Sequence, residues 1–147
     1  MAYECKLRRR VEFHETDMAG IVHYSNFFRY MEAAECEFFR SLGFTLVERP
    51  GDQGLGWPRV HAECDFIHPL KFEDEVEVQL LVSAKKTKSV SYQFRLRKLN
   101  ASPPVEVARG ALTVVCVTHR HGKMMAAPIP KAIADNIEVA PAEALEG

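Results

Sequence analysis

The strongest constraint on the fold is one helical segment in a chain whose other patterned segments have the character of strands. Between Ser25 and Leu42, apolar residues recur at helical spacing in a stripe made of Phe27, Met31, Ala34, Phe38 and Leu42. Such a wide apolar face belongs on a sheet or inside a curled one. Ser25 and Asn26 supply N-cap side chains, and Gly43 is well placed as a left-handed stop. The pattern therefore predicts a helix that ends near Leu42.

Five other segments have the character of strands. The first two alternate apolar and polar residues, and the last three are rich in β-branched residues. They cover residues 3–13, 60–66, 75–84, 90–99 and 105–117. Arg9 lies on the apolar side of the first segment, where we expect this face to meet solvent or an interface. The order of strand, long helix and then strands predicts an α+β fold with a central helix wrapped by a curved antiparallel sheet of about five strands.

Composition excludes several classes of protein. The chain has 147 residues, 19 Lys plus Arg, 20 Asp plus Glu and a net charge of -1, which argues for one domain and against nucleic acid as the main partner. Its four cysteines form no Cys-x-x-Cys pair, and the first residues resemble no signal peptide. No window approaches the ~20 apolar residues of a membrane span. We therefore expect a cytoplasmic protein with reduced thiols.

Acid and base groups gather just before the predicted helix. His14, Glu15 and Asp17 precede Gly20, and the helix starts a few residues later. A helix start offers unpaired N–H donors and a positive dipole end, which can hold an anion or a developing oxyanion. The alternative interpretation is an Asx turn, for which Asp17 and a permissive Gly20 suffice.

The motif in this stretch resembles a known family. Residues 17–32 read Asp-Met-Ala-Gly-Ile-Val-His-Tyr-Ser-Asn-Phe-Phe-Arg-Tyr-Met-Glu. This run resembles the signature of the 4-hydroxybenzoyl-CoA thioesterase and YbgC-like branch of the hotdog-fold thioesterases. The resemblance implies a hotdog domain over residues 1–137, and we expect the acidic tail of residues 138–147 to be frayed.

The resemblance also implies a reaction. It identifies Asp17 as the catalytic carboxylate, acting as nucleophile or as general base, and the backbone N–H of Tyr24 as the donor to the thioester carbonyl. Gly20 matches a position that shapes the loop, and His23 matches a position that is often His in this branch. The implied substrate is a short-chain aliphatic or an aryl acyl-CoA such as 4-hydroxybenzoyl-CoA.

Further positions are binding candidates by the same resemblance. Lys86, Lys88 and Ser89 match a basic turn that contacts the nucleotide end of CoA, although the sequence alone favours a solvated hairpin tip. Arg120 and Lys123 are weaker candidates. Glu32 matches an acidic position near the acyl group. Glu35 lies within the apolar stripe, where we expect it to pair with a basic group across a subunit interface or to line the acyl pocket, and it is the reserve catalytic residue.

Two rival functions and several partner expectations accompany this hypothesis. A dehydratase of the same fold would need a His base, and His14 or His23 could serve; an acyl-CoA-binding protein would keep the fold without turnover. The resemblance implies a dimer or a dimer of dimers, a homotetramer, because one hotdog unit leaves a sheet edge uncovered. We expect no metal, since His119 and His121 lack a third ligand, and no cofactor beyond the CoA of the substrate.

Overall fold

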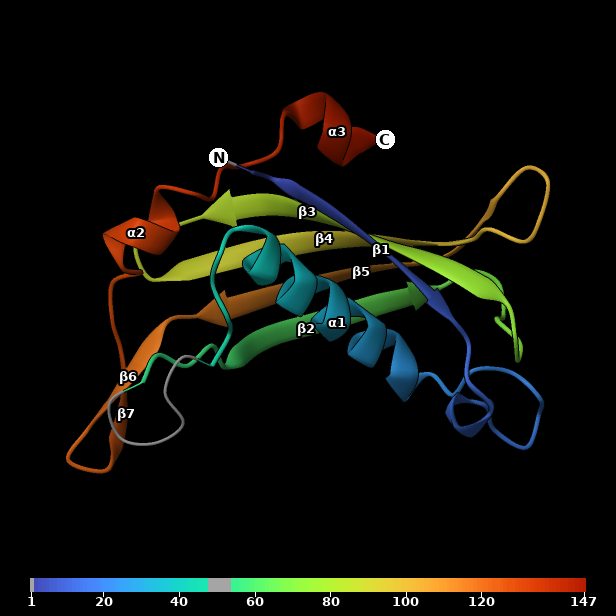
Figure 1. The fold of residues 1–147 in the computed structure, drawn as a ribbon, viewed down its shortest axis with the longest axis horizontal. Helices are drawn as coiled ribbons and strands as arrows, with labels where there is room; N and C mark the ends of the chain where they lie inside the picture. The colour runs from blue at the N-terminus through green and yellow to red at the C-terminus, as the bar shows by residue number, and fades with distance from the viewer. Residues whose placement is uncertain (1, 48–53) are drawn as a thin grey trace.

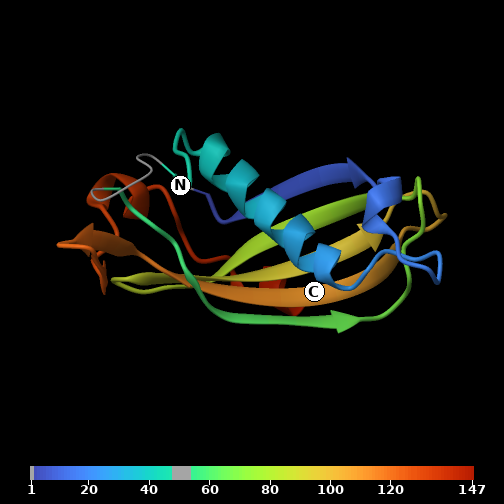
Figure 2. The same ribbon diagram turned by 90° about the horizontal axis from the view of Figure 1, so that it is seen from below.

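One long helix lies across a five-stranded antiparallel sheet in the computed structural model, which describes residues 2–47 and 54–147 (Figure 1). The strands are β1 (Glu4–Arg10), β2 (Arg59–Phe66), β3 (Glu75–Lys85), β4 (Ser89–Lys98) and β5 (Val105–Val115). Their order in the sheet is β1-β3-β4-β5-β2, so β1 and β2 form the two edges. A view from below shows the sheet curving under the helix (Figure 2). The predicted α+β arrangement is confirmed.

Alternation along the strands decides which side chains face the helix. The fully buried side chains on the core-facing side of β3 and β4 include Val76, Val78, Leu80, Val82, Val90, Tyr92, Phe94 and Leu96. The register places Leu80 opposite Phe94 and Val82 opposite Tyr92, so apolar residues meet across the two strands. These cross-strand pairs form the floor of the core.

The helix α1 (Ser25–Ser41) buries the apolar stripe expected from its sequence. Phe27, Met31, Ala34 and Phe38 are each at most 4% exposed. Gly43 follows the helix with a φ of 88°, which confirms the predicted left-handed stop. Within the described residues, no helix is both long and apolar enough to span a membrane.

The start of α1 differs from the N-cap prediction. Tyr24 is the cap residue and Ser25 already lies in the first turn. The side chain of Asn26 donates instead to the backbone carbonyl of Glu15, at 2.8 Å. The Asn26 side chain therefore binds the preceding loop rather than capping the N-terminus of α1 as the sequence pattern predicts.

A glycine lets α1 approach the sheet. A Cβ atom added to Gly110 on β5 would lie 2.1 Å from Cε of Met31, far inside van der Waals contact. Met31 therefore fills the space above Gly110, and any side chain at position 110 would displace the end of the Met31 side chain.

The chain leaves the main sheet earlier than the segment 105–117 predicted. β5 ends at Val115, and a separate hairpin of β6 (Val117–Arg120) and β7 (Lys123–Ala126) follows. At the junction, Cys116 N donates to the carbonyl of Lys88 at 2.7 Å, and Val117 bridges to Gly56. The Cys116–Lys88 bond continues the pairing of β5 with β4 by one residue, and the chain then leaves the main sheet for the β6–β7 hairpin.

Two backbone carbonyls link the tail to the main sheet. After the short helix α2 (Lys131–Ala134), Ala140 N donates to the carbonyl of Val82 at 2.8 Å. The tail then forms α3 (Ala142–Glu146), and Arg95 Nη2 donates to the carbonyl of Leu145 at 2.7 Å. These bonds hold residues that composition alone assigned to a frayed end.

Candidate functional site

The segment between β1 and α1 forms a small hairpin with Asp17 at its turn. After the 3-10 helix η1 (Phe13–Glu15), Thr16 pairs with Val22 in an antiparallel bridge. Asp17 N donates to the carbonyl of Ile21 at 2.8 Å, and Gly20 has a φ of 82°, a conformation that favours glycine. The loop residue Gly20 is therefore needed for the turn that presents Asp17.

The carboxylate of Asp17 is exposed and held by one oxygen only. Its Oδ1 accepts a hydrogen bond from Ala19 N at 2.8 Å, which is the Asx turn that the sequence offered as an alternative. Oδ2 accepts no hydrogen bond from the residues that the structure describes. The turn therefore orients the carboxylate and leaves its second oxygen available to a proton or an electrophile.

The start of α1 presents an amide without a partner. Asn26 N donates to the carbonyl of His23 at 2.9 Å, and Phe27 N donates to the carbonyl of Tyr24 at 3.2 Å. Ser25 N donates to Nδ1 of His23 at 3.3 Å. The amide of Tyr24 donates to no acceptor in the described part of the chain. It is thus a free donor at the positive end of a 17-residue helix.

His23 supports this helix start. Its Nδ1 also lies 2.8 Å from Oγ of Ser25, and its ring stacks on Tyr24 with centroids 4.6 Å apart. The same Nδ1 accepts a hydrogen bond from the Ser25 amide, so the ring is tied to the first turn of the helix. His23 is therefore bound to the backbone at the cap rather than aimed at Asp17 by a hydrogen bond.

Aromatic side chains flank the free amide. Tyr24 is 64% exposed and meets the ring of Phe66 edge to face at 6.5 Å, and Phe66 meets Phe27 in the same way at 5.1 Å. Met18 in the Asp17 hairpin and Ile67 directly after β2 are exposed apolar residues as well. These side chains offer an apolar surface beside Asp17.

Glu35 is separated from Asp17 by much of the helix. It lies eleven residues after Tyr24, which is about 16 Å along the axis. Its side chain is fully buried, and its Oε1 accepts a hydrogen bond from Arg59 Nη2 at 2.5 Å. Glu32 also lies 3.7 Å from that guanidinium. Of the three expectations for Glu35, pairing with a base describes the structure, and the base belongs to β2 of the same chain.

Burial dominates the electrostatics of this pair. It raises the pKa of Glu35, although the charge of Arg59 opposes the shift. The hydroxyl of Tyr92 and Oε2 of Glu35 are both buried without a hydrogen-bond partner in the described residues. The sequence did not predict the role of Arg59. An acidic residue at position 35 in an apolar stripe indicated that a basic partner was needed, but only the fold shows that this partner is Arg59.

The basic turn lies at the far end of the molecule from Asp17. Arg10, which leads into the Asp17 hairpin, pairs with Glu75, whereas Lys86 to Ser89 follow Lys85 at the other end of β3 (Figure 1). An eleven-residue strand spans about 33 Å. Arg120 and Lys123, in the β6–β7 hairpin, lie at this far end as well. One chain therefore does not bring the predicted catalytic and nucleotide-binding residues together.

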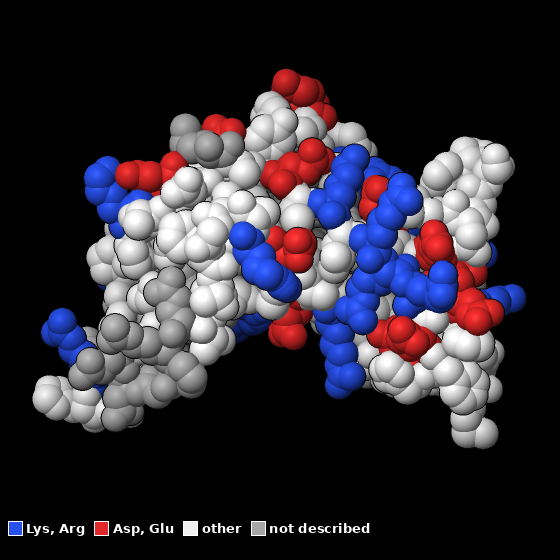
Figure 3. All heavy atoms as spheres, in the orientation of Figure 1, with Lys and Arg blue, Asp and Glu red and all other residues white. Residues whose placement is uncertain are grey.

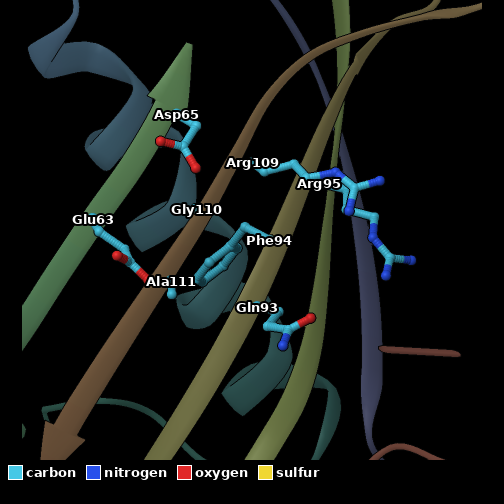
Figure 4. Close-up of a pocket in the computed structure, with 8 residues that line it drawn as sticks. All are labelled: Glu63, Asp65, Gln93, Phe94, Arg95, Arg109, Gly110 and Ala111. Carbon is cyan, nitrogen blue, oxygen red and sulfur yellow. The ribbon is translucent and has the colours of Figure 1, made fainter. Parts of the chain in front are cut away.

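A cavity of about 170 Å³ lies on the opposite face of the sheet from α1 (Figure 4). Its walls include Glu63 and Asp65 of β2 and Arg95 and Arg109 of β4 and β5. Phe94, the neighbour of Arg95, points to the core. Since the sheet separates this cavity from Asp17, it is not part of the candidate site.

Charges of both signs cover the face that carries α1 and β1, and Lys and Arg gather in a band across it (Figure 3). On β1, Lys6, Arg8 and Arg10 occupy three of the four exposed positions, and Glu4 occupies the fourth. Arg10 lies 3.9 Å from Glu75, a weak surface pair. Basic residues along an edge strand also discourage pairing with other chains.

Comparison with known proteins decides the family. A family model described as the thioesterase-like superfamily matches residues 11–137. The chain belongs to the thioesterase-like superfamily. An acyl-CoA thioesterase of the YbgC type from Haemophilus influenzae is 26% identical over 124 residues, which are 84% of this chain and 87% of that protein. The resemblance inferred from residues 17–32 is thereby confirmed.

Two further matches support this membership. A protein from Aquifex aeolicus, provisionally named an esterase, is 49% identical over 73 residues; the match spans 50% of this chain and 56% of that protein, so it covers only about half the length of each. The solved structure of BH1999, a gentisyl-coenzyme A thioesterase, is 31% identical, covers 88% of this chain and 98% of that one, and has a TM-score of 0.76. This member of the superfamily is therefore a hotdog-fold thioester hydrolase.

Glu35→Gln tests the charge buried in the core. Because burial raises the pKa of Glu35 above its ordinary value of 4.5, the native state binds this proton more tightly than the unfolded chain does. The stability that this proton gives is full below the ordinary pKa and is lost as pH rises through the raised pKa. Urea unfolding should show that, as pH rises from about 4 to about 8, the free energy of unfolding of the unmutated protein falls relative to that of Glu35→Gln. A relative gain with rising pH would mean that Arg59 outweighs burial.

Proposed function

We propose that this thioesterase hydrolyses an acyl-CoA with Asp17 as its catalytic carboxylate and the Tyr24 amide as its oxyanion donor. The observation that carries the proposal is that one short hairpin holds both a carboxylate oxygen and a helix-terminal amide that have no hydrogen-bond partner among the described residues. Thioester hydrolysis makes two demands: an oxygen nucleophile must reach the carbonyl carbon, and the carbonyl oxygen must be stabilised as it becomes negative. These two groups meet both.

Two routes balance with the same residues. In the first, Asp17 takes a proton from water, the hydroxide adds to the carbonyl carbon and the C–S bond then breaks. In the second, Oδ2 itself attacks, the CoA thiolate leaves, and water hydrolyses the acyl anhydride. A thiol has a pKa near ~8.5, so the thiolate departs without a dedicated acid. Neither route uses a metal or an added cofactor.

The acyl group would lie against the aromatic surface beside Asp17. Tyr24 and Phe66 offer exposed ring faces and edges there, and the buried ring of Phe27 packs behind Phe66. An aryl or a short aliphatic acyl group suits this surface, and the gentisyl-CoA and acyl-CoA specificities in the names of the relatives agree with that range. Phe38 and Trp57, which could also have lined a pocket, are buried in the core at 0% and 7% exposure.

A second copy of the chain would complete the site. β2 is an edge strand, and Val60 and Phe66 on it are 61% and 50% exposed. If two copies pair antiparallel through β2 about a two-fold axis, the far end of one faces the Asp17 end of the other. Lys86, Lys88 and Ser89 of the partner subunit would then reach the nucleotide. Hydrogen bonds from Cys116 N and Ile129 N to the carbonyls of Lys88 and Thr87 hold this turn.

Thiol release from a panel of acyl-CoAs tests the reaction. Short-chain, long-chain, benzoyl and 4-hydroxybenzoyl thioesters should include at least one substrate, and Asp17→Asn should lower kcat by about a hundredfold or more. Asp135→Asn changes an exposed carboxylate of α2 that pairs with Lys131, and it should leave turnover unchanged. Chelators should have no effect. Undiminished turnover in Asp17→Asn would remove Asp17 from the mechanism, and no turnover of any thioester would favour a binding protein.

Purified heterodimers test the shared site. One chain carries D17N and the other carries K86Q and K88Q, so each variant alone should have a low kcat/KM. The heterodimer has one site with native Asp17 and a native basic turn, and it should regain about half the native activity. Activity no greater than that of the two variants alone would show that the turn and Asp17 do not cooperate across subunits.

A further inference from the structure

Glu15 is a buried carboxylate two residues before Asp17, at 5% exposure. Its Oε1 accepts hydrogen bonds from Glu12 N at 2.7 Å and from the hydroxyl of Tyr30 at 2.9 Å. Its Oε2 lies 3.7 Å from the guanidinium of Arg9. The side chain therefore joins β1, η1 and the second turn of α1 behind the Asp17 hairpin.

The backbone of the same residue holds the other side of the hairpin. The carbonyl of Glu15 accepts hydrogen bonds from His23 N at 2.9 Å and from Asn26 Nδ2 at 2.8 Å, and the second of these is buried. His23 comes directly before Tyr24 and Asn26 two residues after it. The carbonyl of Glu15 thus holds the backbone on both sides of the free Tyr24 amide. Asp17 follows Glu15 by two residues, so the same residue is also connected to the catalytic candidate.

One partner of Glu15, the hydroxyl of Tyr30, is enclosed in the core. Tyr30 is fully buried, and burial together with the hydrogen bond to Glu15 raises the pKa of its hydroxyl. The guanidinium of Arg9 lies 5.2 Å from the centre of the Tyr30 ring, a cation–π contact. This contact explains an arginine on the apolar side of β1, whose side chain is only 34% exposed.

An apolar residue would fill this space without the cost of burying a charge. It could not accept hydrogen bonds from both Glu12 and Tyr30, so it would pack without fixing the direction of the loop. Buried polar networks of this kind are known to specify one arrangement when every member is satisfied.

We propose that Glu15 is a positioning residue that sets the separation between Asp17 and the Tyr24 amide. The inference rests on the proposed function, because it assigns these two groups to one reaction. A misplacement of about 1 Å at a reacting pair can cost about a hundredfold in rate. Loss of the Glu15 network would therefore lower kcat while leaving the apolar surface for the acyl group, and hence KM, in place.

Tyr30→Phe and Glu15→Gln are the test variants, since both keep the size of the side chain. We expect kcat to fall about tenfold in Tyr30→Phe and further in Glu15→Gln, with KM within about twofold of native. The double variant should fall no further than Glu15→Gln, because both changes break one network. The matched control is Tyr92→Phe, which removes another buried hydroxyl beside a buried glutamate, at the other end of α1.

A purely structural role gives a different result. Tyr30→Phe and Tyr92→Phe would then lower the melting temperature alike, with kcat unchanged in both below the transition. That outcome, or a rise in KM with kcat unchanged, would overturn the inference. Loss of kcat in Tyr92→Phe as large as in Tyr30→Phe would overturn it as well.

Amide hydrogen exchange separates this inference from the proposed function. The amide of His23 donates to the Glu15 carbonyl, so its protection should fall in Glu15→Gln and Tyr30→Phe and stay native in Tyr92→Phe. This holds even if the native chain hydrolyses no thioester, which would end the proposed function alone. Unchanged protection of His23 in Glu15→Gln would overturn the positioning role.

Discussion

The burial of α1 against the inner face of the sheet is the interaction on which the rest of the structure depends. Each large apolar side chain that α1 buries contributes about 2 kcal/mol. Phe27, Met31 and Phe38 supply this contact, and Gly110 gives Met31 the room to approach β5. The contact fixes where the helix begins, and the beginning of the helix is where the free amide of Tyr24 lies.

The site follows from how the chain reaches that helix. The Asp17 hairpin is closed by the Thr16–Val22 bridge and held from behind by Glu15, whose carboxylate and carbonyl bind β1, η1 and α1. One oxygen of Asp17 and one amide of the helix start remain unpaired among the described residues. Under the proposed function, these two unpaired groups on a rigid support would provide the carboxylate and the oxyanion donor of thioester hydrolysis.

Local pattern predicted what depends on local chemistry. The stripe of α1, its stop at Gly43, the strands and the Asp17 turn all follow from periodicity or from the conformations that particular residues allow. Contacts between distant segments could not be predicted in this way. Arg59 meets Glu35 only because β2 folds back beside α1, and the tail is held by Arg95 of β4. The distance between the basic turn and Asp17 likewise depends on the length and direction of β3, and no sequence motif gives the direction of a strand in the sheet.

The central claim is that the thioester carbonyl lies between Asp17 and the Tyr24 amide. A crystal structure of Asp17→Asn with a non-hydrolysable acyl-CoA analogue tests this most directly. We expect the carbonyl oxygen within about 3.1 Å of Tyr24 N, the distance of an oxyanion-hole donor, with the side chain at position 17 facing the carbonyl carbon. An analogue bound with its carbonyl away from Tyr24, or in the cavity on the other face of the sheet, would contradict the account.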